Sequence, residues 1–189
     1  MPAYPNIGNV VLASASPRRR ELLASLGLEF TVLVPAIEET AKPNESPRTF
    51  AERLASEKAA AVSADPETTI LAADTIVVQD GNILGKPSDE AHATEMLSSL
   101  SGKTHEVITG VCIRKKAGSR IFSVSTAVEF RELTQTEIAD YVSSGCPMDK
   151  AGAYAIQGGA AHMVRAINGS YTNVVGLPLC ELHKALVSF

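Results

Sequence analysis

The sequence NVVLASASPRRR, residues 9–20, decides how this chain begins to fold. The run from Asn9 to Ala13 is apolar and β-branched enough for a buried strand. A helix should follow the strand, because Ser16 is a good cap for a first turn and Pro17 fits the first helical position. A strand, a tight turn and a helix at the start of the chain predict an α/β or α+β protein.

The rest of the chain alternates short apolar runs with helical patterns, without a linker or a repeat. Further strands are predicted at residues 30–34, 68–78, 104–114, 121–130 and 163–167, with a short returning strand at 83–84 after the Asp80-Gly81 turn and a turn at 115–118. Helices are predicted from Pro17 to a stop at Gly27, from Ser46-Pro47 to about Val62, from a cap at Ser88 to before Gly102, from a Thr134/Glu137 capping box to Gly145, and from Pro178 onward. We expect a single domain over residues 1–189, or two small lobes that share a core.

Composition and charge narrow the class of protein. The chain has 189 residues, 17 Lys plus Arg against 21 Asp plus Glu, a net charge of −4 and 45% hydrophobic residues. Such a composition excludes a disordered chain. It disfavours nonspecific nucleic-acid binding, which needs clustered cations, but it leaves room for one small basic pocket. Residues 1–9 lack the pattern of a signal peptide and no run approaches the length of a membrane span, so we expect a cytoplasmic protein without a membrane partner.

The cysteines and histidines indicate no metal site. Cys112, Cys146 and Cys180 are spaced widely and form no CxxC pair, so we expect three buried, reduced thiols. The four histidines show no spacing typical of metal ligands.

Three arginines, Arg18, Arg19 and Arg20, occupy the first turn of the first predicted helix. Cations are unfavourable there, because a helix N-terminus already carries partial positive charge and unpaired N–H groups. A bound phosphate chain would remove the conflict, with the Ser14 and Ser16 hydroxyls and two guanidiniums around it. The alternative is a solvated basic turn.

Asp74 lies inside the apolar run of residues 69–78, where a lone buried carboxylate is costly. Such an aspartate is hydrogen-bonded for structural reasons, held by a cation, or catalytic. Lys86 falls across the predicted hairpin from Asp74 to within about one residue, and its ammonium is a candidate partner for Asp74 or for a phosphate.

Charged residues at two further places, Lys58 and Glu38-Glu39, are candidates for the functional site. Lys58 follows Leu54 by four residues and so lies at the edge of a predicted core stripe, either as a functional cation or as a lysine that reaches out to solvent. Glu38-Glu39 offers the carboxylate oxygens that Mg²⁺ prefers beside phosphate, although most adjacent glutamates are merely solvated.

Six short motifs occur in one order along nearly the whole chain, and together they resemble the Maf family of nucleotide pyrophosphatases. The motifs are Leu12-Ala13-Ser14-Ala15-Ser16-Pro17-Arg18-Arg19, Ala73-Asp74-Thr75, Gly85-Lys86-Pro87, Leu100-Ser101-Gly102, Asp149-Lys150-Ala151-Gly152 and Gly176-Leu177-Pro178. The resemblance implies an α/β (α+β) fold similar to that of inosine triphosphate pyrophosphatases, with a central mixed, twisted sheet and two lobes around a deep cleft.

The resemblance also implies an activity and a set of site residues. Family members hydrolyse nucleoside triphosphates between the α and β phosphates with a divalent cation, Mg²⁺ or Mn²⁺, and residues 149–158 are similar to the branch that acts on dTTP and UTP. The residues carried over are Asp74 as the proton acceptor, Lys58 and Lys86 as further catalytic residues, Ser14, Arg18, Arg19, Thr75 and Gln157 as substrate-binding residues, and Glu39 and Asp74 as metal ligands.

Two alternatives stay open. The first is a pyrophosphatase for 7-methyl-GTP or another modified purine nucleotide. The second is a binding module linked to septum formation, in which the arginine turn docks a nucleic acid or a protein; the net charge and the scarcity of aromatic residues disfavour a nucleic-acid surface. A homodimer is expected from the resemblance alone.

Overall fold

The computed structural model describes residue 4, residues 7–116 and residues 118–189. Within them, seven strands form one sheet in the order β2-β1-β3-β5-β6-β7, with β4 paired to β3. β1 runs parallel to β2 and β3, whereas the β3–β4 and β6–β7 pairs are antiparallel, so the expected mixed sheet is confirmed. The strands are β1 (Val10–Ala13), β2 (Thr31–Leu33), β3 (Thr69–Gln79), β4 (Asn82–Leu84), β5 (Thr104–Lys115), β6 (Gly118–Phe130) and β7 (Val164–Asn168).

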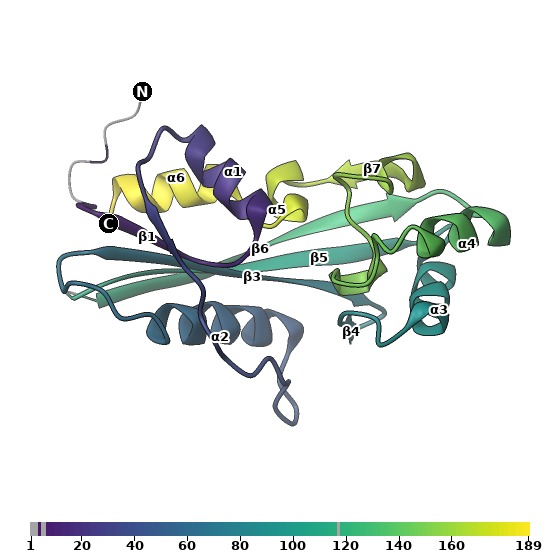
Figure 1. Cartoon of the computed structure of the whole chain (residues 1–189), viewed down its shortest axis with the longest axis horizontal. Helices are drawn as coiled ribbons and strands as arrows, with labels where there is room; N and C mark the ends of the chain where they lie inside the picture. Colours follow the sequence, from purple (N-terminus) through teal and green to yellow (C-terminus); the bar gives the residue numbers. More distant parts are fainter. Residues whose placement is uncertain (1–3, 5–6, 117) are drawn as a thin grey trace. The chain divides into compact units, whose positions relative to one another are not determined.

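Helices cover the sheet (Figure 1). They are α1 (Pro17–Ser25), α2 (Pro47–Ala60), α3 (Glu90–Leu100), α4 (Gln135–Ser143), α5 (Tyr171–Val175) and α6 (Leu179–Val187), with 3₁₀ turns η1 (Ala151–Ala153) and η2 (Ala161–Met163). None of the helices in the described part of the chain combines the length and the apolar character needed to cross a membrane. The chain divides into two compact units, residues 1–74, 109–124 and 176–189 in the first and residues 75–108 and 125–175 in the second.

In the first unit, the alternation of side chains along β3 assigns each face of the sheet to different helices. Leu71 and Ala73 face a cluster with α1 and α6, and Ile70 and Ala72 face a cluster with α2. Figure 1 shows α2 on one side of these strands and α1 and α6 on the other. The next residue on the α2 side of β3 is Asp74, so the pleat of the strand directs its carboxylate toward that helix.

Helix α2 lies unusually close to the sheet. Its contact face is made of small side chains, including Ala55 and Ala59, which are fully buried. Near the start of the same helix, its backbone at Ala51 lies against Gly110 of β5, where an added Cβ would lie 2.3 Å from the carbonyl oxygen of Ala51. A glycine is therefore required at position 110 for the helix to pack at this distance. The close packing brings Lys58 of α2 within contact distance of β3.

The second unit has its own core around α3, α4 and η1. At its centre, the rings of Phe130, Tyr154 and His105 pack edge to face, with centroids 4.8–5.3 Å apart. His105 Nε2 also shares a 2.7 Å hydrogen bond with the Tyr154 hydroxyl. Burial lowers the pKa of His105 to about 4, so the imidazole is neutral in the folded protein at neutral pH.

Most local signals led to the right structure. Ser16 caps α1 and accepts a hydrogen bond from the Arg19 amide, and Gly27 beyond the helix end adopts a φ of 73°. The capping box of Thr134 and Glu137 is present at the start of α4. The predicted turn at 115–118 includes Ala117, which lies outside the described residues.

Some expectations were wrong. Asp89, rather than Ser88, caps α3, because its carboxylate accepts the hydrogen bond from the His92 amide while the Ser88 hydroxyl bonds to Asp89 itself. Cys112 is buried as expected, but Cys146 and Cys180 are exposed. Short helical segments between residues 151 and 175 were not anticipated, since pieces of three to five residues leave no periodic pattern.

Replacing Gly110 by alanine should destabilise the protein by about 1–3 kcal/mol or more, because the new methyl group would push α2 away from β5. The matched control is Gly85→Ala, since a Cβ at position 85 meets no atom within 4 Å. Urea unfolding followed by circular dichroism measures both variants. Equal stability of the two would contradict the close packing of α2.

The neutral His105 makes stability depend on pH. Below about pH 6.5 the unfolded chain binds a proton at this residue, whereas the folded protein does so only near pH 4, so the free energy of unfolding should fall as the pH decreases through this window. The slope should be at most about 1.4 kcal/mol per pH unit. His105→Phe, which keeps a ring in the cluster, should lack this component in urea titrations between about pH 7 and about pH 4.5. An unchanged slope would show that His105 is not its source.

Candidate active site

The carboxyl ends of three neighbouring parallel strands bring candidate residues together in the first unit. Ala13 at the end of β1 is level with Leu33 of β2 and Ala72 of β3. Ser14 therefore follows directly at this edge, the segment after β2 leads away from it, and Asp74 lies two residues further along β3. In open α/β sheets, this edge is where ligands commonly bind.

Asp74 is held by Lys58. Its Oδ1 atom lies 2.5 Å from the Lys58 ammonium, and the two side chains are only 8% and 11% exposed. Lys58 projects from the face of α2 that also carries Leu54 and Ala55, so the core stripe of the helix aims it at the sheet. Asp74 is thus paired with a cation, and the cation that contacts it is Lys58.

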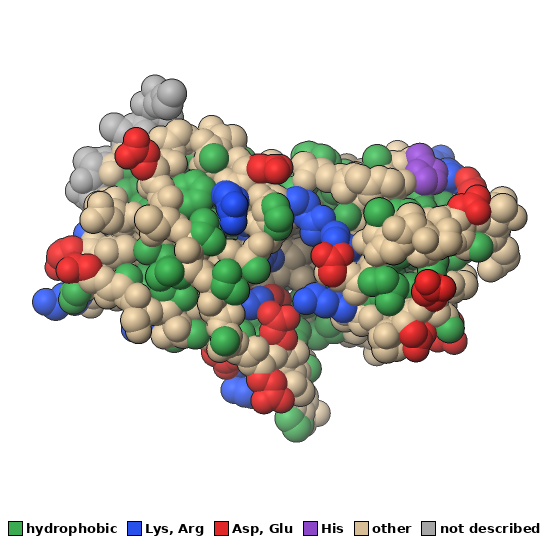
Figure 2. All heavy atoms as spheres, in the orientation of Figure 1, with side chains coloured by type: hydrophobic (Ala, Val, Ile, Leu, Met, Phe, Trp, Pro, Cys, Tyr) green, Lys and Arg blue, Asp and Glu red, His purple; other side chains and the backbone are tan. Residues whose placement is uncertain are grey.

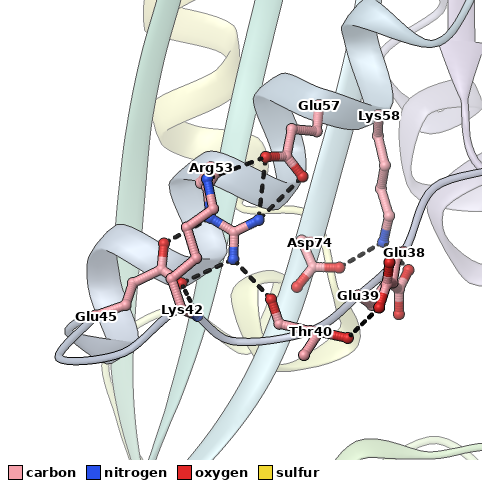
Figure 3. A network of polar contacts seen from close by, with 9 residues as sticks. All are labelled: Glu38, Glu39, Thr40, Lys42, Glu45, Arg53, Glu57, Lys58 and Asp74. Atoms are coloured by element: carbon pink, nitrogen blue, oxygen red, sulfur yellow. Dashed lines mark hydrogen bonds and ion pairs between the residues drawn. The ribbon is translucent and has the colours of Figure 1, made fainter.

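The Lys58 ammonium contacts a second carboxylate. Glu39 Oε1 lies 2.6 Å from Nζ, and the Glu39 side chain is 44% exposed. Figure 3 shows Glu39 and Asp74 approaching the ammonium from the segment after β2 and from β3. The two carboxylates therefore converge on one point, one of them buried and the other open to solvent.

Two convergent carboxylates fit a divalent cation, but only as part of its ligand set. No group of three or more His, Cys, Asp or Glu side chains suited to a metal is found among the described residues. Mg²⁺ is commonly bound by one or two carboxylates, with phosphate oxygens of a substrate and water completing its six ligands. Glu39 and Asp74 match that pattern.

Arg19 lies at the start of α1 and turns back over the strand edge. Its Nε donates a 2.8 Å hydrogen bond to the Gly176 carbonyl, and its Nη1 donates one of 3.3 Å to the Ser14 hydroxyl. The pKa of Arg19 is lowered, because burial outweighs the opposite effect of the negative charges of Asp74 and Glu39. Ser14 is itself 5% exposed and also accepts a hydrogen bond from the Ser16 amide, so it orients the guanidinium.

Two further arginines flank Arg19 at the start of α1. Arg18 is half-buried next to it, and Arg20 is exposed. With Arg19 and Lys58 opposed to Asp74 and Glu39, the described cluster contains two positive and two negative charges. The predicted residues Ser14, Arg18, Arg19, Glu39, Lys58 and Asp74 therefore all belong to the first unit.

The segment that carries Glu39 is irregular and runs from residue 34 to residue 46. In Figure 2, acidic and basic side chains gather on the part of this segment that projects from the surface. It is tied to α2 by Arg53, which bonds to Glu45, Glu57 and the Thr40 carbonyl. The sequence had not singled out these residues; the only signal was the spacing of Arg53 and Glu57, four residues apart on one helix, which is also typical of an ordinary solvated face.

Thr75, Lys86 and Gln157 belong to the second unit. Thr75 is half-buried in β3, while Lys86 and Gln157 are exposed. The loop with Lys86 packs on the η1 turn, because the Gly152 amide donates a 3.0 Å hydrogen bond to the Gly85 carbonyl. A side chain at Gly152, which has a φ of 66°, would lie 2.9 Å from Val77. Gly152 thus permits the close approach that fixes the loop beside Lys86.

Comparison with known proteins identifies the family. The family model described as Maf-like protein matches residues 9–189. The chain belongs to the Maf family. Among its relatives in this family, a dTTP/UTP pyrophosphatase of Geobacter sulfurreducens is 58% identical over 95% of both chains, and a dTTP/UTP pyrophosphatase of Yersinia pestis is 52% identical over 94% of this chain and 91% of the other.

A solved structure supports the fold. The Maf chain superposes on a HAM1 protein from Coxiella burnetii with a TM-score of 0.50 at 18% identity, over 96% of this chain and 99% of that one. At this identity the likeness concerns the fold alone, and it confirms the predicted similarity of architecture.

Removing the Lys58 ammonium should be costly because it leaves a buried charge unpaired. We expect Lys58→Met to lower the free energy of unfolding by about 3 kcal/mol or more. The double variant Lys58→Met/Asp74→Leu should recover most of this loss, since it removes both buried charges. Urea unfolding at neutral pH measures the two variants. A double variant no more stable than the single one would refute the pairing as the cause.

Proposed function

We propose that the protein hydrolyses nucleoside triphosphates between the α and β phosphates, with dTTP and UTP as preferred substrates. The observation that carries the proposal is the buried Asp74 carboxylate, which shares the Lys58 ammonium with Glu39 at a strand edge flanked by Arg19. The names of the close relatives support the substrate class.

In the proposed reaction, Asp74 acts as a general base. Its Oδ1 is bonded to Lys58, and its Oδ2 accepts a proton from a water molecule. The water oxygen forms a bond to the α-phosphorus while the bond from that phosphorus to the bridging oxygen breaks, so that pyrophosphate leaves with the electron pair. The bond to Lys58 fixes the orientation of the carboxylate that serves as the base.

The cations stabilise the negative charge that develops on the phosphates. Lys58 and Arg19 are fixed by their partners before any ligand arrives, so little reorganisation is needed when the charge moves. We assign Arg18 and Lys86 to the same role toward the remaining phosphate oxygens. The Arg19 guanidinium is suited to phosphate because its planar fork can contact two oxygens.

We propose that a divalent cation, Mg²⁺ or Mn²⁺, is held by Glu39 and Asp74. When bound, such a cation neutralises phosphate charge and polarises the phosphoryl group. Glu39 is suited to this role because its side chain is the more exposed of the two.

Selection of the base is assigned to Thr75 and Gln157, together with Arg18. The Gln157 amide and the Thr75 hydroxyl offer both donors and acceptors, which match the imide edge shared by thymine and uracil but not the edge of cytosine. Gln157 lies four residues after the η1 turn and is exposed, so its amide is accessible to a ligand.

A panel of nucleoside triphosphates with detection of released pyrophosphate tests the function. We expect dTTP and UTP to be turned over faster than CTP, GTP and 7-methyl-GTP, and Asp74→Asn to lower kcat by about 10²–10⁴-fold. Circular dichroism serves as the control that this variant remains folded. Near wild-type turnover by Asp74→Asn would refute the base assignment, and a clear preference for 7-methyl-GTP would refute the substrate assignment in favour of a modified purine nucleotide.

A further inference from the structure

The segment that carries Glu39 has no regular structure of its own. Residues 34–46 connect β2 to α2, and most of them are exposed. An irregular, exposed segment keeps a fixed shape only if specific bonds repay the lost conformational freedom. The position of the Glu39 carboxylate therefore depends on whatever anchors this segment to the rest of the first unit.

The anchor is the guanidinium of Arg53. Nε and Nη2 donate to the two carboxylate oxygens of Glu45 at 2.6 and 2.7 Å, and Nη2 also donates to the Thr40 carbonyl at 3.0 Å. Nη1 donates to both oxygens of Glu57 at 3.0–3.1 Å. Figure 3 shows Arg53 at the centre of this network, with every guanidinium nitrogen engaged.

The Arg53–Glu45 pair at the centre of the network is largely shielded from solvent. The side chain of Glu45 is 5% exposed and that of Arg53 is 15% exposed, and the guanidinium lies 5.3 Å from the centre of the Phe50 ring. Such a paired, partly buried guanidinium is less screened than an ordinary surface ion pair. The bonds therefore hold the segment in one arrangement.

Two of these bonds act on the chain close to Glu39. Thr40, whose carbonyl Arg53 fixes, is the next residue in the sequence. Glu45, held on both oxygens, also accepts a hydrogen bond from the Lys42 amide and so closes the turn between them. Helix α2 thus holds both the Lys58 ammonium and, through Arg53, the segment that brings Glu39 to it.

We propose that Arg53 is a positioning residue that fixes the Glu39 carboxylate beside Asp74 and thereby sets the affinity of the site for a divalent cation. The inference rests on the proposed function, because it takes Glu39 and Asp74 as ligands of that cation. Arg53 acts through the 34–46 segment and touches none of the reacting groups. A lysine cannot replace it, since a single ammonium cannot span Glu45, Glu57 and a carbonyl with fixed geometry.

The test compares Arg53→Lys with the control Arg48→Lys. Arg48 lies on the same helix and is exposed, and its guanidinium donates to Ser123 rather than to the 34–46 segment. Binding of Mn²⁺ alone is measured by counting free Mn²⁺ by electron paramagnetic resonance. Arg53→Lys should weaken Mn²⁺ binding by about 10-fold or more, as loss of groups that orient metal ligands commonly does, and Arg48→Lys should leave it unchanged.

Amide hydrogen exchange supplies a readout of position. In Arg53→Lys, the amides of residues 38–46 should exchange faster while those of α2 stay protected. Faster exchange throughout α2 as well would indicate general destabilisation of the helix and would overturn a specific positioning role.

The variant Glu39→Gln separates the inference from the function on which it rests. We expect Glu39→Gln to weaken Mn²⁺ binding, and Arg53→Lys to weaken it no further in that background, because both changes remove the same ligand. If Glu39→Gln binds Mn²⁺ as the wild type does, the metal assignment of Glu39 fails and the inference fails with it. If Glu39→Gln weakens binding but Arg53→Lys does not, only the positioning role of Arg53 is overturned.

Discussion

The buried ammonium of Lys58, shared by Asp74 and Glu39, is the interaction on which the first unit depends. A carboxylate inside an apolar strand is unstable unless a cation meets it, and a lysine in the core stripe of a helix is unstable unless an anion meets it. In the pair, each residue offsets the free-energy cost of burying the charge of the other. The second carboxylate, from a third segment, joins β3, α2 and the 34–46 segment at one point.

This meeting point requires an unusual closeness between helix and sheet. Alanines on α2 and a glycine in β5 remove the side chains that would normally separate the two layers. Lys58 therefore reaches β3 while only 11% exposed, instead of extending to the surface as lysines at the edge of a core commonly do. The small residues between α2 and the sheet therefore allow the ion pair between Lys58 and Asp74 to form.

Much of the fold could be predicted from the sequence, because its signals are local. The cap at Ser16 and the box at Thr134 depend on residues three positions apart, and the helix and strand periods depend on neighbours. Where two adjacent residues can both cap a helix, as at Ser88 and Asp89, the sequence alone could not choose between them. Exposure of a cysteine is likewise decided by tertiary packing and not by residue type.

The charged residues that meet at Lys58 were named from the sequence, but their pairing was not. Asp74 and Lys58 were recognisable because each places a charge in an apolar pattern, yet the hairpin drew attention to Lys86, while the observed partner of Asp74 comes from a helix 16 residues earlier. Arg53 was not recognisable at all, since an arginine four residues before a glutamate is common on solvated helices. Its role arises only when residues 40–45 fold back over it.

The number of contacts made by helix α2 limits how the sequences of this family can diverge. The side of α2 that faces the sheet carries the small residues and also aims Lys58 at β3, and another side presents Arg53 and Glu57 to the 34–46 segment. Even Glu52 is engaged, since it accepts a hydrogen bond from Ser123. Few positions on this helix are free to change, whereas the tip at residues 41–44 is exposed and its Lys42 ammonium lies 4.0 Å from Glu57 at the surface. Evolutionary change should therefore accumulate in the loop while the helix beside it remains nearly constant.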